Sequence, residues 1–366
     1  MNTYSGMSAD QGNSSNPNAA RGATFNPKNR FDSLEIIQEP DDYWHDDDDQ
    51  PPPLRTQFFR DFSQTIITTN TSPDIPFSAS LNPYRGCEHG CAYCYARPTH
   101  EYLGFSAGLD FESRIMVKMD APELLRRELS ARKWKPQTLA MSGVTDCYQP
   151  VERRLEITRG CLAVLAEFRN PVGIVTKNHL VTRDLDLLRE LAAHQAVAVA
   201  ISITTLDGGL AKKLEPRASS PSRRLAAIAE LSQAGIPVRV MFAPCIPGLN
   251  DHEAMDVLRA AAEAGACGAG TVALRLPHGV APLFEQWLET HFPGRREKII
   301  SRVQSMRGGK MNDPRFGIRM RGEGIFADQM AAMFDLARRK TSFRPAPYAQ
   351  LSTASFRVAR AQMDLF

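Results

Sequence analysis

Short apolar runs alternate with amphipathic stretches between residues 78 and 276. The apolar runs are rich in β-branched residues, which is typical of buried parallel strands. We predict strands at residues 78–84, 113–118, 138–142, 172–176, 197–203, 237–242 and 270–276. Most of the intervening stretches repeat their apolar residues with helical spacing, which predicts helices at 121–133, 153–168, 182–194, 221–234 and 251–264.

Regular alternation of strands and helices predicts βαβ crossovers and a parallel sheet. About six such units match an α/β fold with a partial or full TIM-like barrel, in which the reactive groups lie at the carboxyl ends of the strands. A doubly wound open sheet is the alternative. We assign the barrel to residues 55–279.

The two ends of the chain have a different pattern. Residues 1–54 are rich in Asn, Ser, Gly and Asp, and such a composition buries too little apolar surface to offset its ordering entropy. They predict a disordered, acidic N-terminal tail. After the last strand, residues 280–291 and 324–340 have helical periodicity, so we predict a helical, basic C-terminal extension at 280–342 and a flexible tail at 343–366.

The overall composition indicates a globular protein, with 43% hydrophobic and 23% charged residues. The N-terminus lacks the apolar core of a signal peptide, and the longest apolar run, near residues 196–203, is too short to cross a bilayer. We therefore expect a cytoplasmic protein with no membrane partner. In that compartment seven cysteines, three of them close together, indicate metal ligands rather than disulfides.

Charge is distributed unevenly along the chain. Residues 31–50 hold nine acidic and no basic side chains, whereas the chain from Pro51 onward has 41 basic and 31 acidic residues, a net charge of +10. A basic body of this kind fits a polyanionic partner such as a nucleic acid, with the acidic tail competing for the same surface. The tail acting only as a solubilising extension is the alternative.

The strongest motif is the run Cys87-Glu-His-Gly-Cys91-Ala-Tyr-Cys94, which has C-x3-C-x2-C spacing. Soft thiolate ligands select iron–sulfur clusters, zinc or Cu(I). A four-iron cluster normally takes four cysteines, and the next one here is as far away as Cys147. A missing ligand leaves one iron open to a small molecule. A structural zinc site or a simple electron-transfer cluster is the alternative.

This run resembles the signature of the radical S-adenosylmethionine (radical SAM) superfamily. The surrounding segment from Asn82 to Arg97, which includes Tyr93, is similar to the subgroup related to spore photoproduct lyase, and the resemblance covers roughly residues 55–340. It implies that Cys87, Cys91 and Cys94 hold a [4Fe–4S] cluster whose open iron binds SAM. It further implies reductive cleavage of SAM to a 5′-deoxyadenosyl radical, an external low-potential electron donor and DNA-repair-like, lyase-type chemistry.

The resemblance also suggests residues that contact SAM at the strand ends. Ser142, Thr145 and Asp146 follow the second barrel strand, where the family receives the SAM amino group, although a helix N-cap is an equally good explanation. The other candidates are Lys177 for the carboxylate, Ser202, Arg224 and the motif residue Tyr93.

Cys147 is the candidate catalytic residue outside the motif. Spore photoproduct lyases use a hydrogen-donor cysteine near the second strand end, and Gly143 occupies about that position here. Cys147 lies a few residues farther on and is a candidate donor, while a small buried core residue is the alternative. Because of this departure, the resemblance does not by itself imply thymine-dimer reversal.

Two C-terminal features also favour nucleic acid. The stretch from Arg295 to Arg321 holds nine basic and two acidic residues with Phe316 among them, and either tracks a phosphate backbone or forms a solvated surface. The last residues, Gln362 to Phe366, resemble the peptide that bacterial DNA-metabolism proteins insert into the sliding clamp. Two alternatives remain open: radical chemistry on a protein or small molecule, and a nucleic-acid-binding protein with a structural or redox-sensing cluster.

Overall fold

A computed structural model describes residues 21–27, 29–31 and 55–358. Its main sheet has seven strands in the order β10-β9-β8-β7-β6-β3-β2. All neighbouring strands run parallel except the edge strand β2, which is antiparallel to β3. The strands span β2 Ile67–Thr69, β3 Ala79–Leu81, β6 Leu139–Met141, β7 Val172–Thr176, β8 Val197–Ser202, β9 Val238–Cys245 and β10 Ala269–Ala273. Six parallel strands in sequence order form the expected partial barrel.

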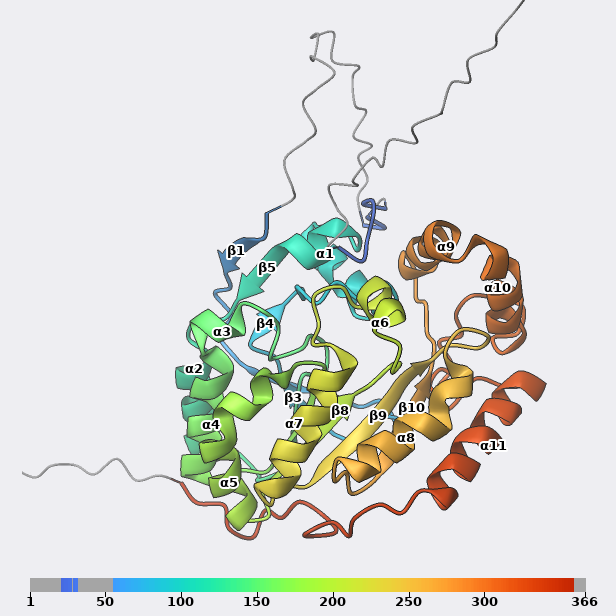
Figure 1. The fold of residues 1–366 in the computed structure, drawn as a ribbon. Coiled ribbons are helices and arrows are strands. Elements are labelled where there is room, and N and C mark those ends of the chain that lie inside the picture. The colour runs from blue at the N-terminus through green and yellow to red at the C-terminus, as the bar shows by residue number, and fades with distance from the viewer. Residues whose placement is uncertain (1–20, 28, 32–54, 359–366) are drawn as a thin grey trace, which may run out of the picture.

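Helices cover the outer side of this sheet (Figure 1). They are α2 Ala121–Ser130, α4 Ile157–Phe168, α5 Leu185–Ala193, α7 Pro221–Gln233, α8 Ala254–Glu263 and α11 Ile325–Lys340. Their apolar faces meet the strands in one continuous core, to which β8 contributes Val199 and Ile201. α7 begins with Ser220 as N-cap and Pro221 in its first turn, and the chain leaves it at Gly235 with a φ of +77°.

Residues 113–118 form a strand, as expected, but not in the barrel. This strand, β5 Arg114–Val117, lies between β1 Gln57–Arg60 and β4 Tyr84–Arg85 in a separate three-stranded sheet. Its neighbours explain the difference, because β5 hydrogen-bonds to β1 and β4 rather than to β3. This small sheet lies beside the cysteine motif, which directly follows β4.

Two predicted helices are interrupted where they approach the carboxyl ends of the strands. Residues 153–168 divide into α3 Glu152–Leu155 and α4, because Glu156 adopts a left-handed φ of +53°. Residues 182–194 divide into the 3-10 turn η2 His179–Asp184 and α5. Helices α1 Leu109–Ser113 and α6 Gly208–Leu214, together with the 3-10 helix η1 Arg97–Leu103, were not predicted.

The C-terminal extension contains three α-helices and the 3-10 turn η4 Pro293–Arg295, because the basic stretch between the two predicted helices forms α10 Arg296–Ser305. α9 Val280–His291 and α10 pack with α6 around a second apolar core that includes Cys91 and Tyr93 of the motif. α11 instead packs against α8 and β10. The outer helical layer of the barrel therefore includes part of the segment that the sequence assigned to a separate extension.

The prediction of a flexible tail at 343–366 is wrong for residues 343–358. This segment runs along the amino ends of the strands (Figure 1), where Arg344, Ser352 and Arg357 donate backbone hydrogen bonds to Ala266, Gln195 and Phe168. The rings of Phe343 and Phe356 pack on the main core. These apolar contacts lie outside any helical or strand repeat, so periodicity did not reveal them. Residues 359–366, including the clamp-like peptide, lie outside the described residues.

The N-terminal tail also departs from the expectation where it is described. Residues 21–27 and 29–31, defined here as the N-terminal strap, lie against the cysteine motif and α1. Ala23 and Asn29 are buried there. Composition alone missed this contact because backbone groups make much of it. The remaining residues of the predicted acidic tail lie outside the described residues.

Within the described ranges, no helix is both long enough and apolar enough to cross a membrane.

Candidate functional site

The cysteine motif lies in residues 86–96, the cluster loop, between β4 and η1. Gly86 and Gly90 have left-handed φ angles of +81° and +66°, which turn the backbone sharply around the three thiols. Cys87 and Cys91 are buried, whereas Cys94 is partly exposed. Burial, the Glu215 carboxylate and the other two thiols raise the pKa of Cys91 well above its usual value. Burial also raises the pKa of Cys94, so these two thiols need a nearby cation to hold them as thiolates.

Arg97 fixes the shape of the cluster loop from inside. Its guanidinium is fully buried and donates two hydrogen bonds to the Cys91 carbonyl, at 3.1 and 2.8 Å. It also donates to the carbonyl of Gly108 at 2.9 Å and forms an ion pair with Glu112. Glu112 in turn accepts hydrogen bonds from the backbone of the strap, at Gly22 and Ala23. The strap, Arg97 and the second cysteine are thus one connected unit.

Glu88 and Gln149 attach the loop to the segment after β6. Gln149 accepts a hydrogen bond from the Glu88 backbone at 2.9 Å and donates one to the carbonyl of Gly86 at 3.3 Å. The Glu88 carboxylate accepts from the Val151 backbone at 2.7 Å and from Arg217 at 2.8 Å. The polar residues between the cysteines therefore serve to position the loop.

His89, the remaining polar residue of the motif, pairs with Asp146. Its Nδ1 lies 3.4 Å from an Asp146 carboxylate oxygen, and its Nε2 lies 3.3 Å from the Asn178 side chain. Burial opposes protonation, but Asp146 and the Cys87 thiol outweigh it and raise the pKa of His89 to about 10. His89 is therefore cationic and contacts both the Asp146 carboxylate and the Cys87 thiol.

Glu215 is the centre of the polar network beneath the cluster loop. Its carboxylate accepts hydrogen bonds from Tyr93 and Thr204, lies 3.3 Å from Lys177 Nζ and forms a buried ion pair with Arg224. Burial raises the pKa of Glu215, but the cations of Arg224 and Lys177 outweigh this and hold it below its usual range. Glu215 was not predicted, because a lone glutamate in a loop belongs to no motif.

The candidate SAM contacts do gather at the carboxyl ends of β6, β7 and β8, but most are already engaged. The Ser142 hydroxyl accepts from the Cys147 backbone, and Thr145 donates to the Tyr84 carbonyl. Asp146 accepts from Thr176, from the backbone of Tyr148 and Lys177, and pairs with His89. The side chains of these three residues thus already stabilise the turn after β6 and position the residues around it.

The Arg224 side chain is also engaged by other residues, whereas the Ser202 hydroxyl is not. The Arg224 guanidinium donates to the carbonyls of Ser219 and Ser202, at 2.7 and 3.0 Å, and pairs with Glu215. It therefore supports the site from behind. The Ser202 hydroxyl, in contrast, makes no hydrogen bond to any other described residue. Lys177 is engaged as well, because its Nζ pairs with Glu215 at 3.3 Å and donates to the Ala243 carbonyl at 3.4 Å. Both Ser202 and Lys177 stay predicted SAM contacts.

The structure does not bring Cys147 to the mouth of the barrel. Its side chain is 0% exposed and packs in the main core, where burial and Asp146 raise the pKa of the thiol. Thr158 donates to its carbonyl at 2.7 Å. The Cys147 thiol therefore packs in the core rather than at the barrel mouth, where the predicted hydrogen donor would have to lie.

Two arginines stacked on aromatic rings lie at the mouth instead. Arg275, just after β10, lies 4.7 Å from the centroid of the Tyr95 ring, and the Tyr95 hydroxyl donates to the Gly143 carbonyl at 3.0 Å. Arg319 lies 4.7 Å from the Phe316 centroid and pairs with Asp74. Tyr95 and Phe316 are 46% and 58% exposed. Tyr95 directly follows Cys94, so this surface adjoins the cluster loop.

The basic stretch from Arg295 to Arg321 is partly neutralised. Arg296, Arg315 and Arg319 form ion pairs with nearby carboxylates, and Arg307 is buried against the carbonyls of Leu274 and Ile318. The exposed basic side chains that make no ion pair with other described residues are Arg295, Lys298, Lys310 and Arg321. The stretch is therefore a weaker electrostatic surface than its composition predicts.

The donor set fits a cluster with one open iron. Three thiols converge from one loop, and the other described cysteines lie in the core or beyond it, at Cys147, Cys161, Cys245 and Cys267. Across the part of the chain that the structure describes, no three His, Cys, Asp or Glu side chains are arranged to hold a single metal ion.

Comparison with known proteins places this site in a family. The Radical SAM superfamily matches residues 81–261. Uncharacterized proteins from Mycobacterium tuberculosis and Mycobacterium bovis are 36% identical over 276 residues, which cover 75% of this chain and 78% of each relative. The Radical SAM Nalpha-GlyT isomerase of Pseudomonas phage M6 is 29% identical over 175 residues, 47% of this chain and 34% of that protein.

Among solved structures, a mutant of spore photoproduct lyase has the same fold, with a TM-score of 0.55 and 16% sequence identity over 76% of this chain and 77% of that one. The Radical SAM match begins at the end of β3 and includes the three-cysteine loop, which agrees with this fold. The chain belongs to the radical SAM superfamily, and its cofactors are a [4Fe–4S] cluster and SAM.

Proposed function

We propose that this protein cleaves SAM reductively and directs the resulting 5′-deoxyadenosyl radical at a nucleic-acid-type substrate. With both cofactors bound, the chemistry supplied is one-electron cleavage of the sulfonium to methionine and the carbon radical, with the electron coming from an external low-potential donor. Cys87, Cys91 and Cys94 would hold the cluster, and Lys177 and Ser202 would orient SAM against it.

The observation that carries the choice of substrate is the exposed Tyr95 ring beside Cys94, with the partly buried Arg275 stacked on it. The exposed Phe316 ring lies nearby and carries Arg319, which is itself paired with Asp74. Exposed aromatic rings stack on nucleobases, and guanidinium groups bind phosphates and stack on bases. The net charge of +10 beyond residue 50 supports the same partner.

Lyase and isomerase chemistry are both compatible with this proposal. A radical formed at a substrate carbon can either break a bond or rearrange, and the pocket that holds the substrate decides between the two. The names of the phage relative and of spore photoproduct lyase represent these two classes. We favour lyase-like chemistry because the resemblance across the segment from Asn82 to Arg97 is to the spore photoproduct lyase subgroup.

The test is anaerobic SAM cleavage by the reconstituted protein with a low-potential reductant, with and without damaged DNA, tRNA or protein extract. We expect 5′-deoxyadenosine, and a several-fold stimulation by nucleic acid that Arg275→Met reduces. Arg259→Met, on the exposed surface of α8, is the charge-matched control. Cys91→Ala should lose the chromophore and SAM cleavage together.

Two results would contradict the proposal. Protein with about four irons and no SAM cleavage would favour a structural or redox-sensing cluster in a nucleic-acid-binding protein. Stimulation by protein extract but by no nucleic acid would assign the radical chemistry to a protein or small-molecule substrate.

A further inference from the structure

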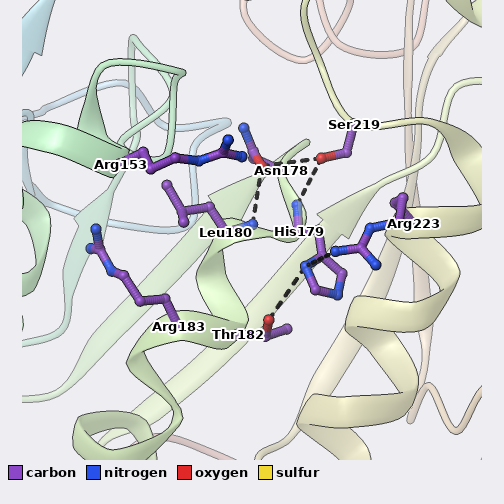
Figure 2. A pocket seen from close by; sticks show the side chains of 8 residues that line it. All are labelled: Arg153, Asn178, His179, Leu180, Thr182, Arg183, Ser219 and Arg223. Atoms are coloured by element: carbon purple, nitrogen blue, oxygen red, sulfur yellow. Dashed lines mark hydrogen bonds between the residues drawn. The ribbon is translucent and has the colours of Figure 1, made fainter.

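A cavity of about 310 Å³ lies beside the carboxyl end of β7, and Figure 2 shows the side chains that line it. Its walls come from α3, from η2 directly after β7, and from the start of α7. Its lining side chains include Arg153, Asn178, His179, Ser219 and Arg223, and none of the eight residues around it is a carboxylate. The three cysteines, Lys177 and Glu215 do not line it, so it is separate from the cofactor site.

The cavity has an excess of positive charge. Arg153 is exposed and makes no ion pair with another described residue. Arg223 donates to the neutral acceptor His179 Nδ1 at 3.0 Å rather than to a carboxylate. The third arginine, Arg183, is neutralised by Glu152 and Asp184. Two uncompensated guanidinium groups therefore border a cavity without acidic lining, which favours an anionic ligand.

Hydrogen bonds hold the polar lining in place before any ligand binds. His179 Nδ1 accepts from Arg223, so its Nε2–H donates to Glu230, at 2.8 Å, and the ring fixes the arginine (Figure 2). Ser219 donates to the Asn178 side chain at 3.0 Å and accepts from the His179 backbone at 2.9 Å. A preorganised site loses little entropy on binding.

The position of the cavity connects it to the reaction. Asn178, one of its lining residues, contacts His89 of the cluster loop at 3.3 Å. The N-terminus of α7, a helix of 13 residues capped by Ser220, begins beside Ser219 and adds favourable dipole potential for an anion. A strand of nucleic acid with one base at the mouth would pass near this rim.

From these observations we infer that the cavity binds a phosphate group, supplied by the backbone of the nucleic-acid strand whose base enters the barrel. Arg153 and Arg223 would make the charged contacts, with the Ser219 and Thr182 hydroxyls beside them. The residues that line the cavity support phosphate as the ligand. The further assignment of that phosphate to a nucleic-acid strand rests on the proposed function.

The experiment has two arms on the full-length holoenzyme, using Arg153→Met with Arg223→Met. Arg132→Met with Arg189→Met is the control, because both are exposed, make no ion pair with other described residues and remove the same charge. The first arm measures ³¹P line broadening of inorganic phosphate. The second measures the salt dependence of binding to a short single-stranded oligonucleotide by fluorescence anisotropy.

We expect wild type and control to bind inorganic phosphate and the cavity variant to lose that binding. In the second arm, the slope of log affinity against log salt should fall by about 0.7 in the cavity variant only, because one phosphate contact is lost. If the cavity variant loses phosphate binding but its slope of log affinity against log salt does not change, the assignment to a nucleic-acid strand would be wrong. The ligand of the cavity would then be a small phosphate-bearing molecule.

If the cavity variant and wild type bind phosphate equally, or if neither binds it, the inference that the cavity is a phosphate site would be wrong. Both arms measure binding and need no SAM turnover. The absence of SAM cleavage would therefore count against the proposed function alone. The absence of the expected binding results would count against the phosphate site alone.

Discussion

At the scale of single residues, Glu215 is the group on which the polar interior of the site depends. It joins Tyr93 of the cluster loop to Lys177 after β7 and Arg224 on α7. A buried carboxylate with two cationic partners is strongly favoured in its charged form, and its removal leaves those cations without compensation. Its role is therefore to position the loop and the lysine.

Glu215→Gln should destabilise the protein by about 3–5 kcal/mol, because the buried Arg224 cation loses its partner. The free energy of unfolding in urea measures this effect. Adding Arg224→Met should recover part of the loss, since the unpaired charge is then gone. Glu190→Gln, on the exposed face of α5, is the control, and equal stability of the two single variants would contradict the role of Glu215.

At the scale of elements, the N-terminal strap is a structural part of the cluster loop. A Cβ atom on Gly22 would lie 1.5 Å from the Gly90 carbonyl oxygen, so only glycine permits this approach. The Glu112 carboxylate depends on the strap for two backbone hydrogen bonds and also pairs with Arg97. Displacing the strap therefore loosens the groups that hold Cys91.

Gly22→Val should make the cluster more accessible, because the strap must leave the loop to relieve the clash. We expect bleaching of the cluster absorbance by a chelator, followed anaerobically, to be several-fold faster than in wild type. Gly294→Val is the matched control, since an added Cβ there meets nothing within 4 Å. Bleaching at the same rate in both variants would refute the role of the strap.

At the scale of the whole molecule, residues 343–358 close the amino ends of the barrel strands, opposite the reactive end. Phe356 lies against Phe168 of α4, with ring centroids 6.3 Å apart, and Tyr348 donates to the Val197 carbonyl of β8. The segment thus connects helices and strands that are distant in the chain. This explains why it is folded although it has no regular secondary structure.

Deleting residues 343–366 should lower the free energy of unfolding by about 2–4 kcal/mol, the scale expected for losing two half-buried aromatic rings and a partly buried hydrogen bond. Deleting only residues 359–366 should leave thermal stability unchanged. That shorter variant also tests the clamp-like peptide, because binding to a sliding clamp should be lost. Equal melting temperatures for the two deletions would disprove the closing role of residues 343–358.

The sequence by itself determined the parallel barrel and the placement of three cysteines in one loop. Strands such as Val172–Thr176 and helices such as Val280–His291 follow from repeats within a few residues, and local repeats decide local structure. Cys87, Cys91 and Cys94 lie within one loop, so their convergence is also local. The spacing of these cysteines indicated a thiolate metal site, and the resemblance of the surrounding segment to radical SAM proteins predicted an iron–sulfur cluster with an open iron.

Only the tertiary structure decided which polar groups meet. Tyr93 and Glu215 are separated by 122 positions, and their hydrogen bond depends on which strand ends are neighbours. The direction of a side chain likewise depends on packing, which turns Cys147 into the core. Neither the strap contact at Gly22 nor the cavity between Arg153 and Arg223 follows a local repeat, because both form between segments that meet only in the folded molecule.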